Sequence, residues 1–349
     1  MVNNPIFVLW ISLGLTVLFF VAIVCTWLYS YIRLLTVNKT NHTLNGMLSD
    51  IFLNSDESSR LAIGKLKRYV EKSNSNKELL IKSLIRRGDD FLESNHRRVT
   101  AILEQTEIVT YLGKLLESKI TYKQSLACRY SGDLRIDAMK ESMYKLIYSR
   151  KNDVIYNMLL ALSKMGDLKG LSDCLRENSN HINLSFRAVV EVVAAFRGSL
   201  EELVKETIDY CDDYMKGILI KAATDKGCAE LVDCFVKYSN SNNKNLRIAC
   251  IRALSDFKGM SNEQCLIAML EDKEWEVRAA AAKGLEKIGT EQCLDVLAKA
   301  VNDKEWWVRQ NAASSLVAIS GGKEYANRIV NGNDRFAREA IVGVLEMSM

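Results

Sequence analysis

One stretch near the C-terminus occurs twice in the sequence, and this repetition limits the folds that are open to the chain. Residues 270–289 recur as residues 300–321, and the shared positions include an aspartate, a tryptophan, a valine and an arginine. The arginine extends the period in both directions, at Arg247, Arg278, Arg309 and Arg338. A helical pattern that repeats at a fixed period of about 30 residues is the signature of a solenoid, in which each repeat packs on the next.

Each copy is predicted to form two short helices. The apolar side chains of residues 262–270 make one stripe at helical spacing, which indicates a first helix of about three turns. We expect Asp272 to cap the N-terminus of the second helix and Gly289 to follow its last turn. A hairpin with one apolar side cannot bury that side alone, so the core must form where the repeats stack.

The segment from Asp272 to Gly289 resembles the HEAT family, in particular its short bacterial form of about 30 residues. It matches the pattern D-x-x-x-x-V-R-x-x-A-x-x-x-L-x-x-I-G at every position, and the next copy departs only where Ser320 precedes Gly321. The resemblance is strongest toward the C-terminus and implies an α-α superhelical solenoid. It implies no reaction, because the repeat is an architecture that serves many functions.

The whole sequence predicts an all-α chain with a HEAT-like solenoid over residues 119–349. Its single proline is Pro5, and no segment alternates polar and apolar residues as a half-buried strand does. Glycines spaced by about 30 residues are expected to end the second helix of each pair, which gives about seven helix pairs. These glycines are Gly132, Gly166, Gly198, Gly227, Gly259, Gly289 and Gly321.

Residues 6–32 carry no charged side chain and are predicted to form a single transmembrane helix. About 20 apolar residues suffice to span the hydrocarbon core, and Trp10 and Trp27 are placed for the two aromatic belts. A cleaved signal peptide is the alternative, but the segment lacks a basic N-terminal region and a small-residue cleavage site. We therefore divide the chain into a membrane anchor (1–33), a helical connector (34–118) and the solenoid (119–349).

Basic residues follow the apolar segment, beginning with Arg33, Lys39 and Arg60, whereas no basic side chain precedes it. The positive-inside rule then places the C-terminal part in the cytoplasm and predicts a single-pass protein of the inner cell membrane. The nine cysteines are dispersed and form no C-x-x-C pair, as expected of small buried residues in a reducing compartment.

Two basic clusters of the connector, residues 65–68 and 86–87, are candidates for contact with anionic lipid head groups. The alternative is that they lie on solvated helix faces. We favour the second interpretation, because Asp89, Asp90 and Glu93 dilute the positive charge of the second cluster.

No group of residues in the sequence has the composition of a catalytic or metal centre, so we expect a non-enzymatic protein without a cofactor or metal. The three histidines, His42, His96 and His181, are scattered, whereas HEAT-type di-iron hydroxylases need repeated His-Glu pairs on facing repeats. The phosphate-binding patterns G-x-x-x-x-G-K-S/T and G-x-G-x-x-G do not occur either.

Aromatic residues at equivalent repeat positions are the best candidates for binding a partner. Trp275 and Trp306 share one position, Trp307 follows the second, and Phe336 matches Trp307 in the last copy. Tryptophan beside arginine is typical of binding hot spots, so the predicted partner-binding set also includes Arg247, Arg278, Arg309 and Arg338. Two alternatives stay open: the rings pack between hairpins, and the arginines form a ladder with aspartates. The HEAT resemblance implies such a ladder through Asp272–Arg278 and Asp303–Arg309.

We expect a scaffold or adaptor whose solenoid binds a protein partner, and we predict that this partner is a membrane protein. Bacterial proteins that look similar accompany envelope machinery such as membrane glycosyltransferases. The alternative is a bilin-lyase-like factor for chromophore attachment or isomerisation, because the HEAT repeats of that class are also similar. Basic and acidic residues nearly balance in residues 119–349, which argues against nucleic acid as a partner.

Overall fold

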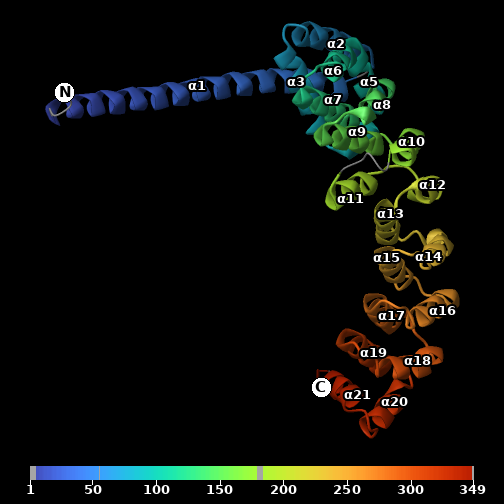
Figure 1. The fold of residues 1–349 in the computed structure, drawn as a ribbon. Helices are drawn as coiled ribbons and strands as arrows, with labels where there is room; N and C mark the ends of the chain where they lie inside the picture. Colours follow the sequence, from blue (N-terminus) through green and yellow to red (C-terminus); the bar gives the residue numbers. More distant parts are fainter. Residues whose placement is uncertain (1–4, 55, 179–183, 348–349) are drawn as a thin grey trace. The chain divides into compact units, whose positions relative to one another are not determined.

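The computed structural model describes residues 5–54, 56–178 and 184–347, and every regular element in these ranges is a helix (Figure 1). The prediction of an all-α chain is confirmed. The chain divides into two compact units, Met1–Lys114 and Leu115–Met349.

Unit 1 begins with α1 (Pro5–Leu53), a helix of 49 residues. The part of α1 from Leu9 to Tyr29 has a mean hydropathy of 2.4, buries none of its side chains in the protein, and is long and apolar enough to cross a membrane. The other helices of unit 1 are α2 (Asp56–Val70), α3 (Asn74–Ile85), α4 (Asp89–Ser94), α5 (His96–Gln105) and all but the last two residues of α6 (Ile108–Leu116).

The C-terminal end of α1 belongs to the core of unit 1. Leu44, Leu48 and Ile51 repeat at helical spacing on one face and are fully buried, with α2 and α3 packed against them. Arg98 of α5 closes the end of the helix, because its guanidinium donates to the carbonyl oxygens of Phe52 at 2.6 Å, Asn54 at 3.1 Å and Ile51 at 3.2 Å. These are carbonyls that a helix leaves without a partner at its C-terminus.

Unit 2 is built from helices that follow one another along the chain. They are α7 (Thr121–Asp133), α8 (Lys140–Tyr144), α9 (Asn152–Lys164), α10 (Leu168–Asn178), α11 (Phe186–Ala194), α12 (Leu200–Thr207), α13 (Asp213–Asp225), α14 (Val232–Tyr238), α15 (Lys244–Leu254), α16 (Met260–Met269), α17 (Trp275–Ile288), α18 (Leu294–Ala300), α19 (Trp306–Ala318), α20 (Gly322–Val330) and α21 (Arg335–Met347). Short 3₁₀ turns connect several of them, at Asp137–Met139, Lys145–Tyr148, Ile208–Tyr210, Ala229–Leu231 and Glu291–Cys293.

The helices of unit 2 form two rows, as a solenoid requires (Figure 1). The odd-numbered helices α9 to α21 each contact the next odd-numbered helix, and we call them the B row. The even-numbered helices α10 to α20 form the A row. Helices α12 to α20 each pack against the B-row helix that follows, whereas α10 packs against α9, the B-row helix that precedes it. The predicted inward positions of α17 are buried, among them Val277, Ala281 and Leu285. The solenoid is therefore confirmed.

The N-terminal end of α17 differs from the prediction, whereas Gly289 follows its last turn as predicted. Asp272 is not the N-cap of α17, because Glu274 holds that position and the carboxylate of Asp272 instead accepts from the backbone N–H of Glu274 at 2.9 Å. Gly289 ends α17 with a φ of −64°, so it is not needed for a left-handed turn. A Cβ at this position would lie 2.5 Å from the carbonyl oxygen of Leu285 and 2.8 Å from Sγ of Cys293, so close packing accounts for the glycine.

Gly132 was expected to end a helix but lies inside α7. There the backbone of α9 approaches so closely that a Cβ would lie 2.6 Å from the Cα atom of Ala161. A glycine inside a helix costs conformational entropy, and close helix packing is its structural role here.

Candidate functional site

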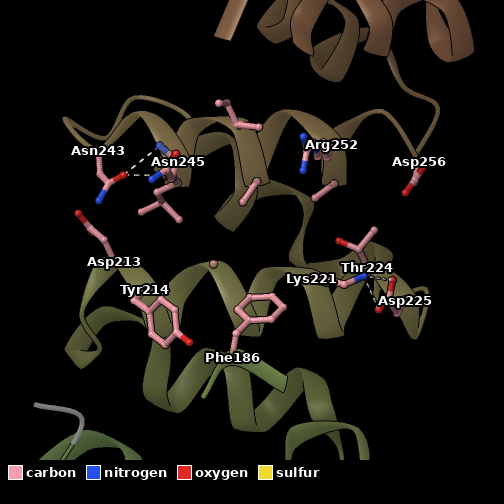
Figure 2. Close-up of a pocket in the computed structure, with 15 residues that line it drawn as sticks. Phe186, Asp213, Tyr214, Lys221, Thr224, Asp225, Asn243, Asn245, Arg252 and Asp256 are labelled. Atoms are coloured by element: carbon pink, nitrogen blue, oxygen red, sulfur yellow. Dashed lines mark hydrogen bonds and ion pairs between the residues drawn. The ribbon is translucent and has the colours of Figure 1, made fainter. Parts of the chain in front are cut away.

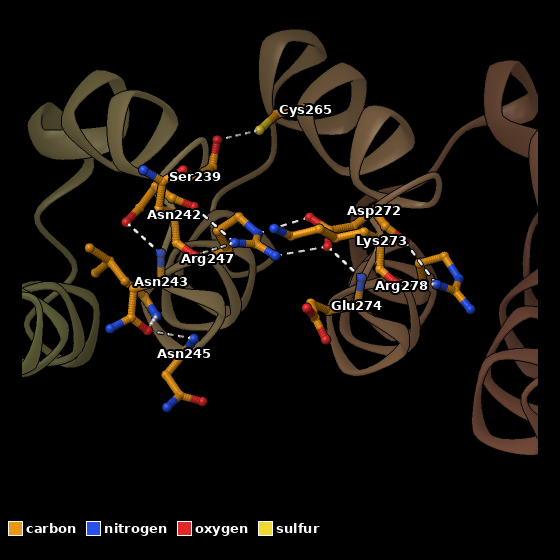
Figure 3. Close-up of polar contacts among 12 residues, drawn as sticks. Ser239, Asn242, Asn243, Asn245, Arg247, Cys265, Asp272, Lys273, Glu274 and Arg278 are labelled. Atoms are coloured by element: carbon orange, nitrogen blue, oxygen red, sulfur yellow. Dashed lines mark hydrogen bonds and ion pairs between the residues drawn. The ribbon is translucent and has the colours of Figure 1, made fainter.

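The arginines of the repeats form ion pairs between successive hairpins (Figure 3). The guanidinium of Arg247 binds the carboxylate of Asp272 through two hydrogen bonds of 2.8 Å. Arg278 binds Asp303 in the same way, at 2.7 and 2.9 Å. Both arginine side chains are buried. Paired bonds between a guanidinium and a carboxylate fix distance and orientation, so these contacts set how one repeat docks on the next.

The register of this ladder differs from the one that the sequence indicated. Each arginine pairs with the aspartate of the following repeat, not with the aspartate of its own. Within one repeat, Arg278 instead donates through Nη1 to the backbone carbonyl of Asp272 at 2.8 Å. This carbonyl lies about one turn before α17, within reach of Arg278. Because Arg278 binds the carbonyl of Asp272, the carboxylate of Asp272 remains available to Arg247 of the preceding repeat.

The aspartates of the ladder are held in their ionised form. Burial by itself would raise the pKa of Asp272, but the hydrogen bonds from Arg247 and from the backbone N–H of Glu274 outweigh it, and the pKa lies below its ordinary value. The same balance lowers the pKa of Asp303, through Arg278 and the backbone N–H of Glu305.

The ladder stops at Arg309. Its Nη1 donates to the backbone carbonyls of Asp303 and Lys304 at 2.9 Å, but among the described residues it has no carboxylate partner. Asp334, which follows Asp303 at the ladder position, instead accepts from the backbone N–H of Ala337 at 3.0 Å and caps α21. The guanidinium of Arg309 lies over the ring of Phe336, 5.3 Å from its centroid.

The predicted aromatic residues are exposed at the starts of B-row helices. The exposed fractions are 36% for Trp275, 54% for Trp306, 57% for Trp307 and 60% for Phe336. The rings of Trp306 and Trp307 meet edge to face, with centroids 4.6 Å apart. We call these four residues the aromatic ridge. Arg338 is also exposed, and its Nη2 donates to the carbonyl of Gly332 at 2.7 Å.

One concave feature of unit 2 was not predicted from the sequence. It is a groove of about 590 Å³ between α13 and α15, with Phe186 of α11 at one side (Figure 2). Its lining also includes Tyr214, Leu246, Ile248 and Arg252. The sequence signal that was available is the 31-residue spacing of Lys221 and Arg252, two cations that line the groove.

The described residues contain no cluster of three or more histidine, cysteine, aspartate or glutamate side chains that could hold a metal ion. His42 lies in α1 and His96 begins α5, while His181 lies outside the described residues. Burial raises the pKa of the Cys293 thiol to about 12 and that of Cys211 to about 11, so both stay protonated at neutral pH.

Residues 262–346 match the sequence profile of the family described as HEAT repeats. No curated protein sequence matches the chain. The profile match and the paired helices together confirm the HEAT resemblance.

Several solved structures are similar to the chain at low identity. Human deoxyhypusine hydroxylase in complex with glycerol is 13% identical, over 90% of this chain and 98% of that chain, with a TM-score of 0.31. The complex of CpcE and CpcF of phycocyanin lyase from Nostoc is 14% identical, over 68% and 93%, with a TM-score of 0.30. Kap121p bound to Nup53p is 14% identical, over 87% of this chain but 37% of that chain, with a TM-score of 0.39. No function is transferred from likenesses this distant.

Proposed function

We propose that the chain is a membrane-anchored, non-enzymatic HEAT-repeat adaptor that binds a protein partner at the aromatic ridge. The observation that carries this proposal is the exposure of Trp275, Trp306, Trp307 and Phe336 at the starts of successive B-row helices. Exposed large apolar side chains that lie together mark interaction sites, and tryptophan is enriched among the residues that dominate binding energy.

The arginines divide between two roles in this proposal. Arg247 and Arg278 are buried and bound to aspartates, so we assign them to the docking of repeats. Arg309 and Arg338 lie beside the ridge without carboxylate partners among the described residues, so we assign them to the partner surface. An acidic residue of the partner could pair with Arg309 while its apolar side chains contact the rings.

The anchor is proposed to be residues 1–33, followed by the connector (34–118) and the solenoid (119–349). Support comes from the apolar stretch of α1, Leu9–Tyr29, and from the basic residues that follow it. The solenoid then lies on the cytoplasmic side of the inner membrane, where its partner is a membrane protein. An accessory role in envelope machinery, for example beside a glycosyltransferase, fits this arrangement.

Site-specific photocrosslinking in membranes tests the proposed partner surface. The crosslinking residue p-benzoylphenylalanine replaces Trp275 or Trp306 in the full-length chain, and the adducts are identified by mass spectrometry. The matched control carries it at Lys299, an exposed position of the A row. We expect both ridge positions to capture the same membrane protein and Lys299 not to capture it. Equal or no capture at all three positions would refute the ridge as the partner surface.

A further inference from the structure

The end of α2 and the turn into α3 lie on the side of unit 1 from which α1 enters. Helix α2 packs against α1, and only residues 54 and 55 separate the two helices, so they run antiparallel. The hydroxyl of Ser59 donates to the carbonyl of Ile51 at 2.7 Å, which fixes the register of the pair. Val70 follows Ser59 by 70 − 59 = 11 residues, so it lies about level with residue 51 − 11 = 40 of α1.

This register sets the distance between the α2–α3 turn and the proposed membrane span. The apolar stretch of α1 ends at Tyr29, and residue 40 lies about 16 Å farther along the helix at a rise of about 1.5 Å per residue. A bilayer has a hydrocarbon core of about 30 Å and a total thickness of about 40–45 Å, so each head-group layer is about 5–8 Å deep. The end of α2 is then about 8–11 Å from the head groups, comparable to the Debye length of about 8–10 Å in dilute salt.

Basic side chains at this end of unit 1 have no carboxylate partner. Arg68 and Lys72 lie four residues apart, are exposed, and form no ion pair with any described residue. Lys65, three residues before Arg68, is exposed and unpaired in the same sense, but it lies about one helical turn farther from the span. In the sequence, Arg33 and Lys39 also fall between the apolar stretch and this level. Positive charge therefore gathers where α1 enters unit 1.

The acidic residues at the same end compensate little of this charge, because most of them already pair with other cations. These pairs are Glu71 with Lys67 at 3.7 Å, Glu107 with Lys77 at 3.9 Å and Glu78 with Lys82 at 3.0 Å. Glu104, in the last turn of α5, is exposed and opposes one positive charge. The exposed cations Lys65, Arg68 and Lys72 outnumber it.

The second basic cluster of the connector lies at the opposite end of unit 1. The guanidinium of Arg87 lies over the rings of Phe52 and Phe91, 5.2 and 4.9 Å from their centroids. Phe52 belongs to the last turn of α1, which is the turn farthest from the apolar stretch. The structure thus separates two clusters that look alike in the sequence: one packs on aromatic rings, and the other lies toward the proposed membrane.

We propose that Arg68 and Lys72 bind anionic phospholipid head groups of the bilayer that α1 spans. Basic residues near the negatively charged cytoplasmic leaflet are attracted to it, and here the helix pair α1–α2 holds them at a fixed distance from it. The contact would keep unit 1 close to the membrane surface. This inference rests on the proposed membrane anchor and does not involve the aromatic ridge.

The test uses the full-length chain in nanodiscs of phosphatidylcholine alone and of an equal mixture with phosphatidylglycerol. Amide hydrogen exchange in residues 67–76, followed by mass spectrometry, reports whether the end of α2 and the turn are protected. We expect exchange to be at least about threefold slower in the mixed discs. The difference should vanish at high salt, because screening shortens the range of the attraction.

The double variant Arg68→Gln/Lys72→Gln should exchange at the same rate in both kinds of disc, because it lacks the cations that attract the lipid. The matched control Arg86→Gln/Arg97→Gln removes two exposed charges at the opposite end of unit 1 and should keep the wild-type difference. Soluble glycerol phosphate added to the phosphatidylcholine discs should not slow exchange. Circular dichroism verifies that each variant is folded.

Equal exchange of the wild-type chain in the two kinds of disc would overturn the proposal, and so would an undiminished lipid effect in Arg68→Gln/Lys72→Gln. Slowing by glycerol phosphate would assign the site to free phosphate esters instead of the bilayer. If the chain stays in the discs through a wash at high salt but shows no lipid effect, the head-group proposal is refuted and the anchor stands. A chain that leaves the discs in this wash refutes both.

Discussion

Arg278 and Arg309 occupy the same position of successive repeats, but their guanidinium groups meet different partners. Arg278 is bound to the Asp303 carboxylate, whereas Arg309 lies over the ring of Phe336. Both donate through Nη1 to two backbone carbonyls of their own repeat. The two side chains therefore provide a matched comparison in which the carboxylate partner is the main difference.

Replacing Arg278 by methionine is expected to lower the free energy of unfolding by about 3 kcal/mol, because it leaves the largely buried Asp303 carboxylate without its partner. The control Arg309→Met should cost under about 1 kcal/mol, because no carboxylate loses a partner. Urea unfolding in detergent, followed by circular dichroism, measures both. Equal losses would show that the ladder does not stabilise the solenoid.

The ladder also predicts how stability depends on pH. The folded-state pKa values of Asp272 and Asp303 are lowered, so the unfolded chain binds protons more readily. Their contribution is fully present above the unfolded pKa of about 3.9 and is lost as the pH falls through the lower folded values. Between about pH 5 and pH 3, the wild-type chain should lose more stability than Arg278→Met. Unfolding midpoints across this range measure the difference, and parallel losses would exclude the Arg278–Asp303 pair as its cause.

The sequence identified the residues of the ladder but not their pairing. The 31-residue spacing marks Asp272 and Arg278 as repeat positions. It does not say which copy of the aspartate each arginine meets, because that depends on how far the following loop reaches toward the preceding helix. For the same reason Asp272 was expected to cap its own helix, although its carboxylate binds Arg247 and the N–H of Glu274.

At the scale of elements, α1 links the proposed membrane span to the core of unit 1 in one continuous helix. Its last turn is held by Arg98, which binds three backbone carbonyls, and by the hydroxyl of Ser59, which donates to the carbonyl of Ile51 at 2.7 Å. The ring of Phe52 meets that of Phe91 edge to face, with centroids 4.8 Å apart. These contacts join the end of α1 to α2, α4 and α5.

Arg98→Met is expected to loosen the end of α1, because the carbonyls of Ile51, Phe52 and Asn54 lose their hydrogen bonds to a charged group. Each such bond contributes up to about 3 kcal/mol. Backbone amide exchange in residues 44–54 should become at least about tenfold faster, as measured by mass spectrometry. Arg97→Met is the control, since Arg97 is exposed and adjacent. If both variants exchange at the wild-type rate, Arg98 does not hold this helix end.

At the scale of the whole molecule, the sequence predicted the solenoid because its period is strict in the last repeats, where the core positions recur every 31 residues. The groove between α13 and α15 could not be predicted in this way. It combines Phe186, which lies outside that strict period, with Tyr214 and Arg252 of the next two B-row helices. Only the stacking of three weakly similar repeats brings these residues together.

The central claim is that an anchored solenoid recruits a membrane protein through its aromatic ridge, and comparative co-purification in detergent tests it most directly. We predict that one membrane protein is recovered with the wild-type chain and with Lys299→Ala, and that its recovery falls at least about tenfold with the double variant Trp306→Ala/Trp307→Ala. Undiminished recovery with the folded double variant would contradict the account.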